Sequence, residues 1–163
     1  MKNTLPKNVK AYLSKRAADN WNLKWNKNEE IINAIIVPAL AEFDNLKLLF
    51  NSLTENDNDY FRNTLVIIVV NNKRTEKEDY RNNNTKTINF LNKIIDENYH
   101  NDELINQIKV SGLQIGYVDA SSSGFEMDNK NGGVGLARKI GMDEALKVFN
   151  YSNPGKKIMV CLD

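Results

Sequence analysis

The residues with the clearest capacity for chemistry follow apolar runs of β-strand length. Asn71 and Asn72 come directly after the run at 64–70, and Asp163 ends a second run at 157–163. A side-chain amide both donates and accepts hydrogen bonds, so it can pair with the edge of a nucleobase. A carboxylate is a preferred ligand for a hard divalent cation. Polar residues at strand ends therefore indicate a ligand site.

A glycine-rich segment at 131–138 contains a further potential binding group. It reads Asn-Gly-Gly-Val-Gly-Leu-Ala-Arg and opens a helical pattern. The free N–H groups of a helix start attract anions, and Arg138 could reach a diphosphate. The segment matches neither the dinucleotide fingerprint nor a Walker loop, which need other glycine spacings or Gly-Lys-Ser/Thr. A tight turn with close helix–sheet packing explains the same glycines, so both interpretations stay open.

Each remaining candidate also has a structural explanation. Glu42 stands at a helix start, where a carboxylate is favourable without any ligand. Asn71 and Asn72 could be turn residues in an Asn-rich chain, and one carboxylate is not a metal site. His100 lies in a polar run and is expected to be exposed and inert. No Cys/His cluster predicts zinc, and no Ser/His/Asp arrangement can be assembled around this histidine.

Apolar runs and helically spaced apolar residues predict the strands and helices that must position these residues. Apolar runs predict strands at 31–37, 64–70, 113–118 and 157–163, and the continuous β-branched runs at 31–37 and 64–70 suit strands buried in a parallel sheet. Helical spacing predicts helices at 43–53, 85–99 and 134–150. Pro38 is expected to end the first strand, and 76–84 reads as a charged, Asn-rich loop. The alternation predicts an α/β fold with a mainly parallel open sheet, whose ligands bind at the carboxyl ends of strands.

One domain is predicted at 31–163, preceded by a polar, partly helical arm at 1–30. Within the arm, residues 9–16 fit a short helix, and Trp21 and Trp25 are expected to pack onto the domain. In the last helix, a stripe of small residues should let the helix lie close to the sheet. The stripe is Ala137, Gly141, Ala145 and Val148.

Composition excludes several classes of partner. The chain has 163 residues, 41% hydrophobic and 26% charged, with a net charge of +1. This balance argues against nucleic acid or an anionic membrane as an electrostatic partner. The single cysteine, Cys161, forms no internal disulfide and suggests a reducing compartment. Apolar runs fall short of the ~20 residues of a membrane-spanning helix, and the amino terminus has no secretory signal.

Taken in order, four segments resemble the family 2 glycosyltransferases of the GT-A fold. Residues 35–46, Ile-Ile-Val-Pro-Ala-Leu-Ala-Glu-Phe-Asp-Asn-Leu, look like that family's opening IIPAYNEEENL. Residues 68–72, Ile-Val-Val-Asn-Asn, look like its VVDD or VVNN strand end. Residues 133–141, Gly-Val-Gly-Leu-Ala-Arg-Lys-Ile-Gly, look like its GxGxARNxG helix start. Residues 157–163 look like the strand entering its D-x-D motif, so the resemblance covers 31–163.

This resemblance implies a Rossmann-like, nucleotide-binding half of a GT-A domain. The implied nucleotide-binding residues are Pro38, Ala39, Glu42, Asn71, Asn72 and Arg138. The first three would line the nucleoside pocket, one of the two Asn residues would read the base, and Arg138 would face the diphosphate. Asp163 would touch the ribose or the metal, Mn²⁺ or Mg²⁺, which acts as a Lewis acid on the leaving diphosphate.

The implied activity is sugar transfer from a UDP- or GDP-linked donor to a saccharide or lipid-linked acceptor, with inversion. The acceptor half, the second D-x-D carboxylate and the carboxylate base are not in this chain, so we expect it to be inactive alone. The implied location is the cytoplasm or the membrane periphery. Two alternatives stay open: a non-catalytic nucleotide-binding or interaction module, and a nucleotidyltransferase-like α/β enzyme.

Overall fold

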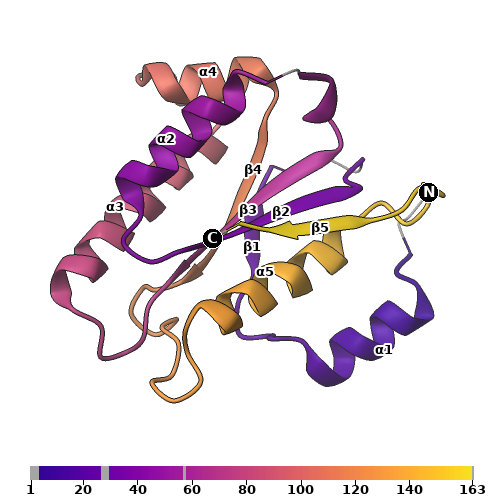
Figure 1. The fold of residues 1–163 in the computed structure, drawn as a ribbon, viewed down its shortest axis with the longest axis horizontal. Coiled ribbons are helices and arrows are strands. Elements are labelled where there is room, and N and C mark those ends of the chain that lie inside the picture. The colour runs from indigo at the N-terminus through magenta and orange to yellow at the C-terminus, as the bar shows by residue number, and fades with distance from the viewer. Residues whose placement is uncertain (1–3, 27–29, 57, 163) are drawn as a thin grey trace.

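The computed structural model describes residues 4–26, 30–56 and 58–162. Strands and helices alternate along most of the chain (Figure 1). The strands are β1 Leu23–Trp25, β2 Asn33–Ala39, β3 Thr64–Asn71, β4 Gln114–Ala120 and β5 Ile158–Cys161. The helices are α1 Lys7–Arg16, α2 Phe43–Thr54, the 3-10 helix Asn58–Tyr60, α3 Glu78–Ile95, α4 Glu103–Ser111 and α5 Val134–Val148.

The strands form one five-stranded sheet in the order β1-β4-β3-β2-β5. β2 pairs in parallel with β3 and with β5, and β3 pairs in parallel with β4. β1 pairs antiparallel with β4 at the edge. The chain is thus an α/β protein with a mixed, mainly parallel sheet, as the sequence predicts.

Helices cover both faces of the central strands, which explains why these strands are apolar without interruption. α2, α3 and α4 lie on one side of the sheet, and α5 with α1 lies on the other (Figure 1). Along β3, Val66 and Ile68 belong to the core beneath the first group of helices. Leu65 and Ile67 belong to the core beneath α5. All four side chains are fully buried.

β2 continues through Pro38 to Ala39, so the predicted end of this strand at Pro38 is wrong. The carbonyl oxygen of Ile36 accepts from the N–H of Leu162, so the backbone of Ile36 faces β5. Backbone groups two residues apart face the same neighbouring strand, and Pro38 therefore also faces β5. The last residue pair between these strands is Ile36 with Cys161. The missing N–H of Pro38 thus lies past the ladder, and no strand bond is lost.

The expected loop at 76–84 is mostly helix, because α3 begins at Glu78 and ends at Ile95. Two acidic residues in its first turn, Glu78 and Asp79, interact favourably with the helix dipole. Asn residues favour turns because their amides compete for local backbone groups. Here the amides of Asn83 and Asn84 bond instead to other segments, which removes that competition.

Two elements that the sequence analysis did not predict complete the fold. α4 has ordinary helix signals, since Asp102 accepts from the N–H of Ile105 at 3.1 Å and Gly112 ends the helix with φ 76°. β1 is only three residues long. Such a short strand carries almost no alternating pattern, and its existence depends on pairing with β4.

The described part of the segment before residue 31 packs onto the sheet through its two tryptophans, as the sequence analysis predicts. The helix expected at 9–16 is confirmed as α1. Trp21 is buried, and its Nε1 donates to the carbonyl oxygen of Phe125 at 2.7 Å. Trp25 lies in β1 and packs against the same core as Trp21. No helix in the described part of the chain has both the length and the apolar character needed to cross a membrane.

The small-residue stripe of α5 packs directly on the sheet. Ala137 and Ala145 are fully buried, and Gly141 lies against β2 and β3. A Cβ added at Gly141 would lie 2.5 Å from Cγ2 of Ile36 and 3.1 Å from Cγ2 of Val69. Both neighbours are β-branched core residues with stiff side chains. Close packing of α5 therefore requires glycine at this position.

Replacing Gly141 with Ala should lower the free energy of unfolding by up to about 2 kcal/mol. Overpacking costs about 1–3 kcal/mol, and the better helix propensity of Ala returns only about 1 kcal/mol. Gly135→Ala is the matched control, because a Cβ there meets no described atom within 4 Å. The control should be neutral or stabilising. Urea unfolding compares the two variants, and equal effects would contradict the close approach.

Candidate functional site

The candidate site lies at the carboxyl edge of the sheet, where the chain changes direction across it. From β2 the chain moves through β3 to β4 on one side, and α5 then leads back to β5 on the other side of β2. The connecting helices also change face at this point, from α2, α3 and α4 to α5 (Figure 1). Open α/β sheets bind ligands in the crevice outside such a reversal.

A pocket of about 460 Å³ opens at this edge. Five of the six predicted nucleotide-binding residues line it, although they come from three separate parts of the chain. They are Pro38, Glu42, Asn71, Asn72 and Arg138. Lys73, Glu76 and the start of α5 at Gly133 and Val134 complete the walls. The volume lies within the ordinary range for small-molecule sites.

Of the two other predicted site residues, Ala39 does not line this pocket. Ala39 is 1% exposed and belongs to the core beneath α2 and α3, on the opposite face of the sheet from α5. Neighbouring strand residues point to opposite faces, so the side chain of Ala39 points away from the face of Pro38 and into the core. Asp163, the predicted metal ligand, lies outside the described residues. Within those residues, no three His, Cys, Asp or Glu side chains form a group that could hold a metal ion.

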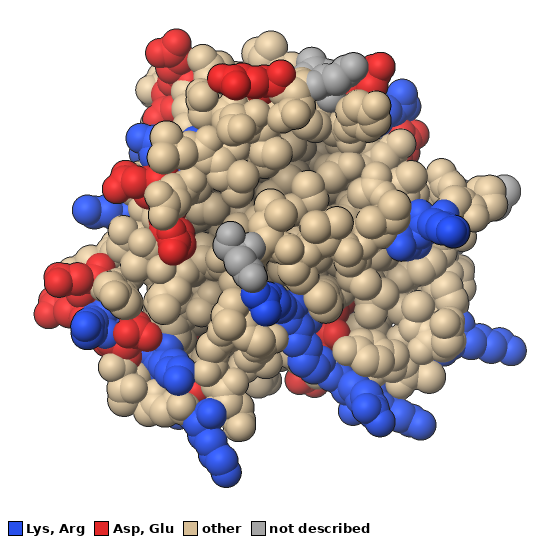
Figure 2. All heavy atoms as spheres, viewed as in Figure 1, with Lys and Arg blue, Asp and Glu red and all other residues tan. Residues whose placement is uncertain are grey.

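The start of α5 gives one wall of the pocket a positive character. The helix has no side-chain cap and no acidic residue in its first turn. Its first N–H groups and its dipole therefore favour an anion. Arg138 and Lys73 line the same pocket. On the face in Figure 2, a run of Lys and Arg side chains also crosses the region of α5 and α1.

Two carboxylates, Glu42 and Glu76, balance these cations in the pocket lining. Glu42 accepts from Nδ2 of Asn45 at 2.5 Å, which fixes the orientation of its side chain. A carboxylate is acceptor-only when ionised, so it suits the hydroxyl groups of a ribose or a sugar. The pocket thus fits a ligand that combines an anionic group with several hydroxyl donors.

Asn71 and Asn72 have different surroundings, although they are neighbours at the end of β3. The amide of Asn72 donates to the carbonyl oxygen of Lys73 at 3.1 Å, and its Oδ1 accepts from Asn84 at 2.9 Å. Asn71 is 5% exposed, and its Oδ1 has no hydrogen-bond partner in the described part of the chain. A buried acceptor without a donor is costly. Asn71 is therefore the residue of this pair with an oxygen free to accept from a ligand.

Asn84 is a site residue that the sequence analysis missed. It is 1% exposed, and its Oδ1 accepts from the N–H of Ala41 at 2.9 Å. Its Nδ2 donates to the carbonyl oxygen of Asn71 at 3.1 Å and to Oδ1 of Asn72. One amide thus connects the turn after β2 with the end of β3. Ala41 has a positive φ of 58°, a strained conformation for a residue with a Cβ.

The neighbouring Asn83 caps α2 from outside that helix. Glu42 occupies the N-cap position but makes no side-chain capping bond. The Oδ1 of Asn83 accepts instead from the N–H of Phe43 at 3.0 Å. This bond satisfies one of the free donors of the helix start. The Asn-rich run at 82–84 was the sequence feature that could have indicated this role. The same composition fits a loop as well as a helix whose Asn side chains bond to other segments.

The turn before α5 is built around Asp128. Its Oδ1 accepts from the N–H of Lys130 at 2.7 Å and of Asn131 at 2.9 Å, and its Oδ2 accepts from the side chain of Asn131. The backbone N–H of Asn131 contributes most to lowering the pKa of the Asp128 carboxyl, followed by the N–H of Lys130. The positive charge of Arg74 lowers the same pKa further. The turn therefore holds the ionised carboxylate.

Asn84→Asp should destabilise the protein by about 3 kcal/mol, because it removes two donors and brings a buried carboxylate to two acceptor oxygens. Asn83→Asp is the matched control. Its new charge sits at the start of α2, where the dipole adds about 0.3–1 kcal/mol of stability. Denaturant unfolding measures both variants. The same sign of effect in both would contradict the proposed roles of the two amides.

Acid should loosen the turn before α5 only at unusually low pH. Because the pKa of Asp128 is lower in the folded protein, its contribution to stability is present above the unfolded pKa and is lost as the pH falls through the folded pKa. Carboxyl-carbon NMR against pH should place its midpoint below the ordinary Asp value of about 3.9. Asn131→Ala should move the midpoint upward. An ordinary midpoint in the wild-type protein would refute this account.

The chain matches no protein-family model, no curated protein and no solved structure. The resemblance to family 2 glycosyltransferases therefore depends on the four segments quoted above. Three of these segments supply most of the pocket lining: the turn after β2, the end of β3 and the start of α5. The fourth contains β5, and Leu162 after this strand lines a second pocket with Pro38 and Glu42.

Proposed function

We propose that this chain binds a nucleotide-sugar at the carboxyl edge of its sheet and forms the donor-binding part of a glycosyltransferase of the GT-A type. The observation that carries the proposal is the shared pocket of Pro38, Glu42, Asn71, Asn72 and Arg138. These residues belong to three segments that lie far apart in the sequence. Their convergence supports one ligand that contacts all three segments.

The topology supports a Rossmann-like interpretation of this fold. In chain order, the four parallel strands lie as third, second, first and fourth across the sheet. The classic doubly wound sheet has the order 3-2-1-4-5-6, and its ligand lies where this order reverses, between the first and fourth strands. Here those strands are β2 and β5, and Pro38 at the end of β2 lines the pocket.

The pocket lining contains two chemically different sets of groups, and we assign one part of the ligand to each. The start of α5, Arg138 and Lys73 suit the diphosphate, because N–H groups and cations stabilise its charge. Asn71 and Glu42 suit the nucleoside, because their oxygens accept from a base N–H and from ribose hydroxyls. Asn72 holds the end of β3 in place through its bonds to Lys73 and Asn84.

In the proposed reaction an acceptor hydroxyl attacks the anomeric carbon, a carboxylate base takes its proton and the nucleoside diphosphate leaves. The base and the acceptor site are assigned to no residue of this chain. When bound, Mn²⁺ or Mg²⁺ would stabilise charge on the leaving group. Its implied ligand, Asp163, lies outside the described residues, and the pocket lining alone does not supply a metal-binding group.

Calorimetric titration with UDP and GDP, with and without Mn²⁺, tests the proposal. We expect binding of one nucleoside diphosphate, strengthened by metal. Arg138→Ala should weaken this binding about 10-fold, because a charge-assisted hydrogen bond is worth about 1.5–3 kcal/mol. The affinity for the nucleoside alone should stay the same, since it lacks the phosphates that Arg138 faces.

The other outcomes separate the rival functions. Metal-independent binding without sugar transfer favours a non-catalytic nucleotide-binding module. A preference for the nucleoside triphosphate favours a nucleotidyltransferase-like enzyme. No binding of any nucleotide would refute the proposal, and detectable transfer by the 163-residue chain alone would show that its own residues supply the base.

A further inference from the structure

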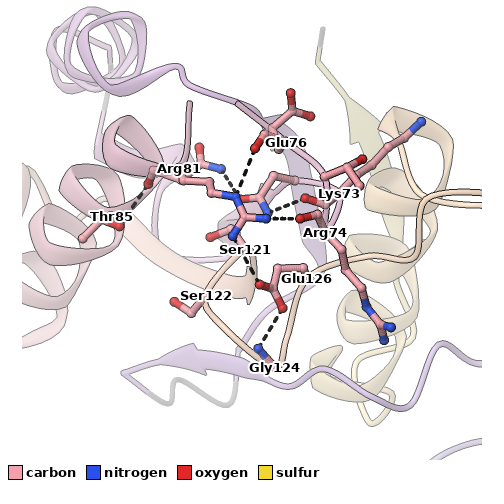
Figure 3. A network of polar contacts seen from close by, with 12 residues as sticks. Lys73, Arg74, Glu76, Arg81, Thr85, Ser121, Ser122, Gly124 and Glu126 are labelled. Carbon is pink, nitrogen blue, oxygen red and sulfur yellow. Dashed lines mark hydrogen bonds and ion pairs between the residues drawn. The ribbon is translucent and has the colours of Figure 1, made fainter. Parts of the chain in front are cut away.

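Arg81 of α3 lies where the loops that follow β3 and β4 meet (Figure 3). Its guanidinium donates through one terminal nitrogen to the carbonyl oxygen of Arg74 and through Nε to that of Glu76, the latter at 3.2 Å. The other terminal nitrogen lies 3.7 Å from Oε1 of Glu126. One side chain thus joins a helix and two loops.

Glu126 is well placed to complete this junction. Its side chain is 12% exposed, and its Oε2 accepts from the N–H of Gly124 at 2.7 Å. One carboxylate therefore holds its own loop and pairs with Arg81 at the same time. The side chains of Lys73 and Arg74 extend away from the guanidinium in Figure 3, so these like charges stay apart.

The two loops are also bonded directly to each other. The N–H of Met127 donates to the carbonyl oxygen of Asn72 at 3.0 Å, and the N–H of Arg74 donates to that of Met127 at 3.1 Å. The Oδ1 of Asn129 accepts from the N–H and the hydroxyl of Thr75. These bonds continue the pairing of β3 with β4 beyond the ends of the strands.

The junction borders the pocket without being part of its lining. Lys73 and Glu76 line the pocket on either side of the backbone that Arg81 holds. On the other loop, a Cβ added at Gly132 would lie 2.7 Å from Cβ of Met127 and 3.3 Å from Cγ of Lys73. The start of α5 follows at Gly133. Movement of either loop would therefore displace both cationic parts of the pocket wall.

We propose that Arg81 is a positioning residue that fixes the phosphate-facing rim of the pocket, a role that rests on the proposed function. A planar guanidinium presents its donors in a fixed fork, which fits two carbonyl oxygens and a carboxylate at once. A lysine in the same place offers one nitrogen on a flexible stem and satisfies fewer of them. Arg81 acts through Lys73, Glu76 and α5, and it does not touch the ligand.

Hydrogen exchange in the ligand-free protein tests the positioning itself. In Arg81→Ala, the amides of Arg74 and Met127 should exchange at least about 10-fold faster, because loss of the fork removes the charge-assisted hydrogen bonds that stabilise the loop pairing. Arg81→Lys should give an intermediate rate. Arg62→Ala is the matched control, because that arginine pairs with Glu30 at 2.7 Å and is not in the pocket lining. Its exchange pattern at Arg74 and Met127 should equal that of the wild type.

Binding measurements then separate this role from a general loss of structure. Arg81→Ala should weaken UDP and pyrophosphate about 10-fold and leave uridine unchanged, with partial recovery in Arg81→Lys. Unchanged exchange at Arg74 and Met127 would overturn the positioning role, whether or not nucleotide binds. Equal weakening of UDP and uridine would also overturn it. If the wild type binds no nucleotide but exchange responds as expected, the proposed function fails and the structural junction stands.

Discussion

The parallel pairing of β2 with β3 is the constraint on which the site depends. Asn33–Ala39 pairs without a break with 64–70, and both faces of β3 are buried under helices. A shift of register by one residue would move every apolar side chain to the wrong face. The same register places the turn after β2 and the end of β3 at one height. The position of the pocket is thus a direct consequence of the hydrophobic core.

Beyond the last strand pair, side-chain hydrogen bonds hold the loops in place, because the backbone hydrogen bonds between the strands have ended. Asn84 joins the two strand ends, Asn83 caps α2 and Arg81 holds the loops after β3 and β4. All three residues come from the first half of α3. Buried backbone groups must find partners, and loops cannot supply them in a regular pattern. One helix on one face of the sheet therefore supports the whole rim around Asn71 and Lys73.

Most of the sheet could be predicted from the sequence, because buried parallel strands leave long β-branched runs such as 64–70. The small-residue stripe also predicted the close approach of α5 at Gly141. The sequence could not predict α3 before residue 85, because Asn83 and Asn84 favour turns until their distant partners are known. For the pocket lining, position at a strand end predicted Asn71 and a glycine-rich helix start predicted Arg138, whereas Ala39 points away from the face of Pro38. The Asn-rich run around Asn84 fits a loop as well as a helix, and Arg81 left no local signal.

The strained turn after β2 has a consequence for how this sequence can change over evolution. Ala41 holds a backbone conformation that costs an L-residue roughly 1–2 kcal/mol, and the amide of Asn84 is its bonded partner. Glycine at position 41 would adopt the same φ without that cost. The stability gained would then offset the loss of the hydrogen bond that Asn84 makes. A β-branched residue at position 41 would instead increase the strain, and the protein would then need that hydrogen bond. Homologous sequences should therefore vary at positions 41 and 84 together, although the two lie on different elements.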